Sequence, residues 1–339
     1  MYYVLISFVV LFLPVLFHDY MQDIYLIQIS QQTLLTYTLL LTYVLFFVTV
    51  GYSLKIKIRN TYFPKKIRFL LVMAFVVFLF YWLMKNIDSL ASYGIILALT
   101  GGDVGVSARL DATGNIDNWF TISLISGFIL PIILRLSYNS KILQFFPLTI
   151  SLIGGSKFLF FAHLLTVFDN FKIKWLNVFA LMFVVVSGLS VFAVLKDISL
   201  ISAPEKILRR LILLPGYICL IKIENANVLN NFATIARDTY QIGWGWSGNG
   251  GAPSFVLVDM FVVGQNIWVI QIAIFSTLIG LFHRSYCSLC YKMNARYFSS
   301  FPWLILVYSS GPIIMFKFFV LFITIYVFGS NKRRIANVR

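Results

Sequence analysis

Several basic residues of this sequence lie where a cation could bind a phosphate group. Lys157 follows Gly154, Gly155 and Ser156 in the middle of a long apolar stretch. A glycine-rich turn exposes backbone N–H groups, and a helix that begins after it offers its positive end, so Lys157 is expected to help bind an anion. The alternative is a lysine that only extends its ammonium group to the membrane surface.

Arg109 is the second candidate cation. It lies in a polar segment with Asp103 and Asp111 nearby and with Thr113 and Gly114 after it. Arginine binds phosphate through two parallel hydrogen bonds, which predicts contact with a phosphate or a sugar. A local ion pair with either aspartate on a solvated loop is the alternative.

Arg209 and Arg210 are adjacent in a segment predicted to be an interfacial helix. The pattern Ser202-Ala-Pro-Glu205 is typical of a helix start, apolar residues then recur at helical spacing, and Pro215 is expected to end the helix. The two arginines are predicted to bind a diphosphate, although contact with anionic lipid headgroups is an alternative. Arg237 is a weaker candidate of the same kind.

The segment 243–253 contains five glycines, one proline and two tryptophans, a composition that excludes a regular helix. Trp244 and Trp246 are predicted to stack on sugar rings, or else to form an aromatic belt at the membrane surface. We include Asn249 of the same segment among the substrate-binding residues.

Asp259 lies soon after this segment, inside an apolar stretch. A carboxylate at membrane depth is costly, so it is expected to have a function. It could act as a general base on an attacking hydroxyl, or it could be the structural partner of an arginine.

No metal or other cofactor is predicted. Cys287 and Cys290 form one C-x-x-C pattern near His283, but no fourth zinc ligand is evident, and ordinary thiols are the simpler interpretation. The three cysteines of the chain give no disulfide framework.

Composition predicts the elements that must position these residues. Of 339 residues, 60% are hydrophobic and 12% are charged, far from the balance of a soluble domain. Apolar runs long enough to cross a bilayer recur, so we predict an all-α integral membrane protein, one domain over 1–339, with about ten transmembrane or half-crossing helices. The predicted full spans are 2–17, 33–53, 69–83, 119–134, 176–195 and 255–282, and the predicted helical hairpins are 142–168 and 301–328.

The distribution of charge predicts the orientation. The net charge of +15 comes from basic residues in short loops, which favours the positive-inside rule over nucleic-acid binding. The acid-free loop 55–68 is expected to be cytoplasmic, and the loops 86–118 and 196–254 to face the other side. The first span lacks a basic start and a cleavage site, so it is predicted to be retained.

Three local patterns resemble the bacterial O-antigen and capsule repeat-unit polymerases of the Wzy type. They are Gly154-Gly-Ser-Lys157-Phe, Arg209-Arg-Leu-Ile-Leu-Leu-Pro215-Gly, and Gly248-Asn-Gly-Gly-Ala-Pro-Ser254-Phe followed by Asp259 and Val263-Gly264. Lysine stands at the family's usual arginine in the first, and aspartate at its usual glutamate in the third.

The resemblance implies a GT-C-like helical bundle in the bacterial inner membrane, with a large periplasmic loop before the penultimate helical unit. It implies a glycosyltransferase that joins undecaprenyl-diphosphate-linked oligosaccharides at the periplasmic face, without a nucleotide sugar. Membrane lipids, a chain-length regulator and a flippase are the implied partners.

Three other functions remain as alternatives. A flippase or exporter of the same lipid-linked oligosaccharide usually has two related halves, and no repeat is evident in this sequence. An O-antigen ligase shares the fold and the phosphate chemistry but typically depends on a periplasmic histidine, for which His18 is the candidate. A sugar acyltransferase is the third alternative. It would need a histidine or an arginine in a pocket that faces the cytoplasm, and the sequence assigns no residue to such a pocket.

Overall fold

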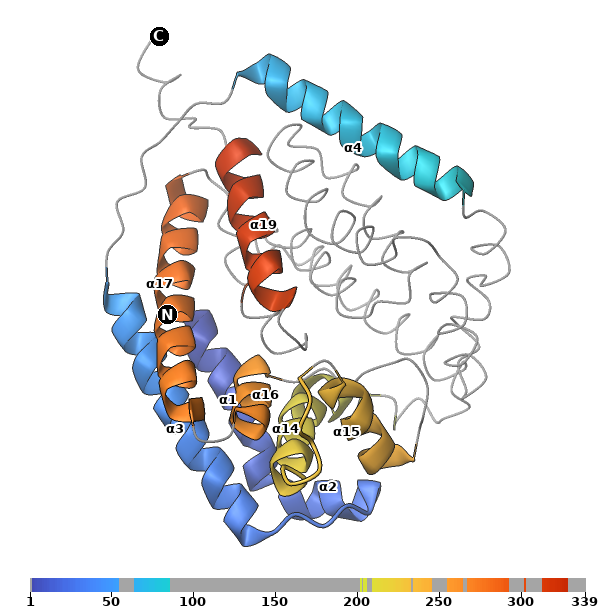
Figure 1. The fold of residues 1–339 in the computed structure, drawn as a ribbon, viewed down its shortest axis with the longest axis vertical. Helices are drawn as coiled ribbons and strands as arrows, with labels where there is room; N and C mark the ends of the chain where they lie inside the picture. Colours follow the sequence, from blue (N-terminus) through green and yellow to red (C-terminus); the bar gives the residue numbers. More distant parts are fainter. Residues whose placement is uncertain are drawn as a thin grey trace, which may run out of the picture. The chain divides into compact units, whose positions relative to one another are not determined.

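The computed structural model describes ten helices in two compact units (Figure 1). The residues that it describes are 2–54, 64–85, 202, 204–205, 209–232, 234–245, 255–264, 267–292, 302 and 313–328. Every regular element among them is a helix, as predicted. The first unit comprises Met1–Arg59, Leu208–Leu289 and Ser299–Phe319, and the second comprises the remaining chain.

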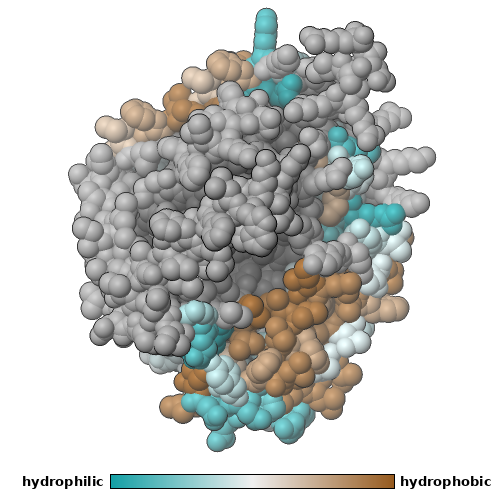
Figure 2. Space-filling model, turned by 180° about the vertical axis from the view of Figure 1, so that it is seen from behind, coloured by the Kyte–Doolittle hydropathy of each residue, from teal (hydrophilic) through white to brown (hydrophobic). Residues whose placement is uncertain are grey.

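Two of the described helices are long and apolar enough to cross a membrane, α3 (Gln31–Ser53) and α17 (Trp268–Lys292). A third crossing is added if α1 (Tyr2–Leu16) and α2 (His18–Tyr25), which meet at a bend of 68°, form one broken span. The predicted spans 2–17 and 33–53 therefore correspond to helices. Figure 2 shows apolar side chains gathered in a band on one face, with hydrophilic residues along its lower edge.

The helices α3 and α17 run in the same direction. The Tyr43 hydroxyl of α3 donates a hydrogen bond to the carbonyl of Val269 at 3.1 Å, and further along both helices Gly51 meets the backbone of Thr277. Because the partners advance together, the C-terminal ends of α3 and α17 lie on the same side of the unit.

Glycines allow this contact to be unusually close. A methyl group added at Gly51 would lie 2.0 Å from the carbonyl oxygen of Thr277, and one added at Gly280 would lie 2.1 Å from that of Val48. Small residues let membrane helices pack backbone to backbone, where dispersion forces and weak hydrogen bonds replace the hydrophobic effect.

Replacing Gly280 with alanine is therefore expected to destabilise the protein by about 1–3 kcal/mol, because backbone atoms of α3 would have to move. The measurement is the midpoint of thermal unfolding in detergent. Gly243→Ala is the matched control, since its methyl group would meet only side-chain atoms at 3.5 Å or more. An equal loss for both variants would contradict the backbone contact.

Arg284 of α17 binds the C-terminal end of α3. Its Nη1 donates to the carbonyls of Tyr52 and Ser53 at 2.6 and 2.7 Å, and its guanidinium carbon lies 5.6 Å from the centre of the Tyr52 ring. The last carbonyls of a helix have no donor within the helix, so this arginine satisfies the C-terminal end of α3.

One prediction about the segment 202–215 is wrong. Pro215 does not end a helix but lies in the first turn of α14 (Leu214–Glu224), which follows the π-helix η3 (Arg209–Leu213) without a break. Proline removes a backbone hydrogen bond from a helix, and here it directly follows the π-helical turn, where the regular i→i−4 pattern is already interrupted. All residues from Pro215 to Ile223 are buried, and α14 packs against α1, α3 and α16 (Val256–Val263).

The predicted continuous span 255–282 is also wrong. The chain forms α16, leaves the helix at Gly264 and begins α17 at Trp268. Gly264 is a poor helix former and is followed by Gln265 and Asn266, which favours an interruption at this place. The apolar sequence on both sides of Gln265 and Asn266 predicts one continuous helix, although these two residues are polar.

Two further helices agree with predicted apolar stretches. The predicted span 69–83 lies within α4 (Lys65–Lys85), which belongs to the second unit. The helix α19 (Ile313–Phe328) starts directly after Pro312, where the second arm of the hairpin 301–328 was predicted. The predicted elements 119–134, 142–168 and 176–195, and the loop 86–118, lie outside the described residues. The total of about ten transmembrane or half-crossing helices and the GT-C-like arrangement remain predictions.

Candidate functional site

Four aromatic residues gather where α2, α14 and α15 (Ile235–Trp244) meet (Figure 1). The ring of Tyr25 stacks on that of Tyr217 at 5.7 Å between centroids and meets the edge of Trp244 at 5.6 Å. Tyr240 lies against Trp244 at 4.9 Å. We call these four residues the aromatic cluster.

Arg209 adds a positive charge to the aromatic cluster. Its guanidinium carbon lies 5.9 Å from the centre of the Tyr25 ring, within the range of a cation–π interaction. The same Tyr25 ring also stacks on Tyr217, so Arg209 lies beside a packed pair of aromatic rings. A guanidinium oriented in this way suits an anion with several oxygens, such as a phosphate.

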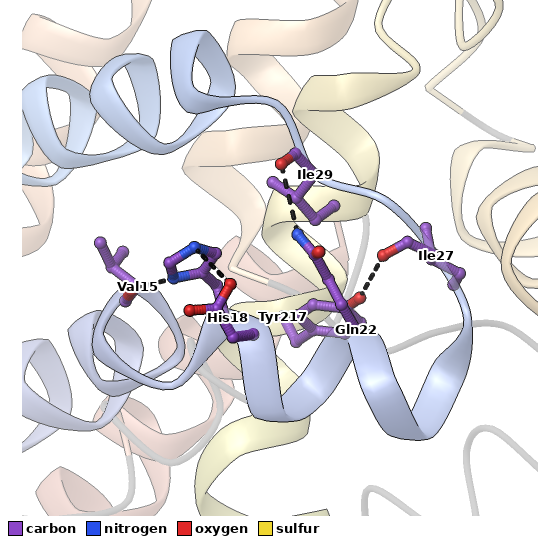
Figure 3. Close-up of polar contacts among 7 residues, drawn as sticks. Val15, His18, Gln22, Ile27, Ile29 and Tyr217 are labelled. Atoms are coloured by element: carbon purple, nitrogen blue, oxygen red, sulfur yellow. Dashed lines mark hydrogen bonds and ion pairs between the residues drawn. The ribbon is translucent and has the colours of Figure 1, made fainter.

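The segment between α2 and α3 is fixed to the cluster by hydrogen bonds (Figure 3). The Tyr217 hydroxyl donates to the carbonyl of Ile27 at 2.9 Å, and the Gln22 side-chain amide donates to that of Ile29 at 3.3 Å. Burial, together with the neighbouring Tyr25 hydroxyl, raises the pKa of Tyr217 to about 12, so this hydroxyl stays a hydrogen-bond donor at neutral pH.

The C-terminal end of α14 is joined to the start of α3. The Glu224 carboxylate accepts hydrogen bonds from the backbone N–H of Ser30 at 2.8 Å and from its hydroxyl at 2.9 Å. Ser30 is the N-cap of α3, and its Oγ accepts from the Thr33 N–H. A carboxylate at this position is also stabilised by the positive end of the helix.

Glu224→Gln is expected to lower stability at neutral pH by less than about 1 kcal/mol, because solvent screens this partly exposed group. Burial alone would raise the pKa of Glu224, but the hydrogen bonds from Ser30 and Thr33 outweigh it and lower the pKa below its usual value. The stabilisation is therefore present above the unfolded-state pKa and is lost as the pH falls through the folded-state pKa.

Thermal midpoints of wild type and Glu224→Gln measured from neutral to acidic pH test this dependence. The difference between the two proteins should shrink as the pH falls. A difference that stays constant or grows towards low pH would contradict the proposed role of the carboxylate.

Asp259 lies in the interior and is paired with a lysine. Its Oδ1 is 2.6 Å from Nζ of Lys222 in α14, and both side chains are 0% exposed. The sequence allowed an arginine as the structural partner, and the structure has Lys222 instead. The role of Asp259 as a general base stays a prediction. Its carboxylate is 0% exposed in this structure.

The other predicted site residues are not part of the aromatic cluster as the structure describes it. Arg237 is 53% exposed, and its Nε lies 3.3 Å from the Asp238 carboxylate of the same helix. Arg210 is part of η3, but its side chain lies outside the description. Arg109, Lys157, Trp246 and Asn249 lie outside the described residues. Of the predicted residues, Arg209 and Trp244 each lie against the ring of Tyr25.

Sequence reasoning missed four residues of this region: Tyr25, Tyr217, Tyr240 and Lys222. The tyrosines gave no local signal, because their meeting depends on how α2, α14 and α15 pack. Lys222 did give a signal, as a single charge within the apolar run 211–223. It was overlooked because the whole segment was assigned to a loop.

His283 and Cys287 lie close together on α17, with 3.4 Å between Nε2 and Sγ. Among the residues that the structure describes, no three histidine, cysteine or acidic side chains gather as metal ligands.

Comparison of the chain with protein-family models, with curated proteins and with solved structures finds no match.

Proposed function

We propose that this chain is a polysaccharide repeat-unit polymerase of the bacterial inner membrane. It would transfer a growing glycan from undecaprenyl diphosphate to the end of the next lipid-linked repeat. The proposal includes a multi-pass bundle with a GT-C-like arrangement and a substrate site at the periplasmic face.

The observation that carries the proposal is Arg209 supported by Tyr25 within the aromatic cluster. This cluster lies close to Ser30, where the membrane-crossing α3 begins, so it suits a substrate with its lipid in the bilayer and its headgroup outside. The guanidinium offers charge to a diphosphate, and aromatic side chains suit the apolar faces of sugar rings.

The same residues suit the chemistry of the transfer. The bond between the donor sugar and the diphosphate breaks as an acceptor hydroxyl attacks, and negative charge grows on the leaving diphosphate. A cation fixed beforehand stabilises that charge without reorganising during the reaction. Arg209 is therefore proposed as the catalytic residue that touches the diphosphate, and Trp244 as a sugar-binding residue.

Asp259 is not included among the groups that touch the substrate, because its carboxylate is buried against Lys222. In this proposal the proton of the acceptor hydroxyl is released to water at the membrane surface. Among the described residues, Arg209 is the group that would neutralise the charge on the leaving diphosphate.

A chromosomal deletion complemented with wild type or with Arg209→Ala tests the proposal. Loss of the chain should leave single repeats on the cell surface, and wild type should restore the ladder of long glycans. If the deletion instead removes all surface repeats and traps lipid-linked units in the inner leaflet, the chain is a flippase. If long unattached polymers accumulate on the lipid carrier, it is a ligase.

A further inference from the structure

The ion pair between Lys222 and Asp259 is unusual in being fully withdrawn from solvent. Both side chains are 0% exposed, and 2.6 Å separates Nζ from Oδ1. Removing two charges from water is costly, and their mutual attraction often only offsets that cost. Such a pair is therefore poorly explained as a contribution to net stability, and a role in specificity has to be considered.

The surroundings of α14 are the reason to consider specificity. Its nine residues from Pro215 to Ile223 are all buried, and Lys222 is the one charged residue among them. A mostly apolar helix relies on a few directional contacts to fix its rotation. Besides Lys222, α14 has two of them, from the Tyr217 hydroxyl to the carbonyl of Ile27 and from Ser30 to Glu224. Gly216 lies where an added methyl group would be 2.6 Å from the carbonyl oxygen of Leu11 in α1, so this close contact also favours the observed rotation.

The pair adds a charged contact that also selects one register, within the packed interior. Lys222 lies in the last turn of α14 and Asp259 in the first turn of α16, so each charge lies at the helix end that favours its sign. A slip of α14 by one residue would rotate its side chains by about 100° and leave an ammonium facing apolar groups. Single buried polar groups fix the register of coiled coils in the same way.

The register of α14 also fixes the position of Arg209. The π-helix η3 begins at Arg209 and passes into α14 without a break, so a slip of α14 would carry the guanidinium away from the Tyr25 ring. Arg209 and Lys222 lie near opposite ends of this helical segment, but they belong to one continuous element.

We propose that the Lys222–Asp259 pair is a register lock for α14, and that Lys222 is thereby a positioning residue for Arg209. The inference rests on the proposed function only where it gives Arg209 a role in substrate binding.

Cross-linking tests the lock without any substrate. In a full-length chain whose cysteines Cys219, Cys287 and Cys290 are replaced with alanine, Tyr25→Cys and Arg209→Cys are joined with a short bismaleimide. The parent is expected to cross-link efficiently. Adding Lys222→Met with Asp259→Leu keeps an apolar interior, so the protein should still elute as a folded monomer in detergent but lose most of the cross-linked product.

A second pair of substitutions keeps the test decisive. Lys222→Asp with Asp259→Lys retains an ion pair between the same two helices. Each charge then lies at the helix end that disfavours its sign, so cross-linking should recover in part but still exceed that of the apolar double variant. Equal cross-linking in the parent and the folded apolar double variant would overturn the proposal. So would an exchanged pair that folds but cross-links no better than the apolar one.

Glycan assays on the same exchanged pair, with Tyr25 and Arg209 intact, separate the lock from a base at Asp259. Polymer formed by the exchanged pair supports positioning, since position 259 then carries an ammonium group and no carboxylate. A folded, cross-linking exchanged pair that makes no polymer would overturn the assignment of Lys222 as a positioning residue. If the wild type made no polymer, the proposed function would fail while the cross-linking result would still decide the register lock.

Discussion

Replacing Asp259 with leucine while Lys222 is kept should lower the free energy of unfolding by about 3–5 kcal/mol. The remaining ammonium would lie in an interior where its side chain is 0% exposed, without the carboxylate now 2.6 Å away. Lys222→Met should have an effect of similar size, because it leaves the carboxylate uncompensated instead. The measurement is the yield of monomer in detergent and its thermal midpoint.

Ser276→Ala is a suitable control for these two variants. Ser276 is also 0% exposed, and its hydroxyl has no hydrogen-bond partner among the described residues. Removing an unsatisfied hydroxyl should be nearly neutral. If Asp259→Leu were as mild as Ser276→Ala, the carboxylate and the ammonium would not depend on each other for stability.

The second large effect is expected on activity. Arg209→Ala should reduce polymer formation by about 100-fold at equal protein level, as removal of one preorganised group that stabilises developing charge typically does. Arg209→Lys should retain part of the activity, because lysine keeps the charge but lacks the planar fork and stacks less well on Tyr25. The measurement is the length distribution of surface glycan in complemented deletion cells.

Arg237→Ala is the comparison for this effect. Arg237 is a second arginine from the same part of the chain, but it is 53% exposed and lies beside Asp238. Its loss should reduce polymer formation by less than about tenfold, since an exposed cation already shared with a carboxylate provides little charge stabilisation. A larger loss for Arg237→Ala than for Arg209→Ala would move the site to the exposed face of α15.

The two N-terminal apolar helices could be predicted from the sequence because hydropathy over about 20 residues is a local property, whereas α17 was predicted with wrong bounds. The predicted span 33–53 differs from α3 by two residues at its start, and 2–17 differs from α1 by one residue at its end. Arg209 and Trp244 could be chosen as site residues because arginine and tryptophan are conspicuous near an apolar boundary.

The remaining features depend on packing that a sequence window does not contain. Pro215 lies near the start of α14 and not at the end of a helix, and α14 is buried by α1, α3 and α16, which a local sequence window does not contain. The pairing of Lys222 with Asp259 joins residues 37 positions apart. The tyrosines of the aromatic cluster come from three helices, so only the tertiary structure brings them together.

The common direction of α3 and α17 has a consequence for how the chain is inserted. Two helices that cross a bilayer in the same sense must deliver their C-terminal ends to the same compartment, whichever compartment that is. A reporter enzyme fused after Ser53 and one fused after Lys292 should therefore give the same compartment signal. The contact between Gly51 and Thr277 can form only in a chain for which these two signals agree.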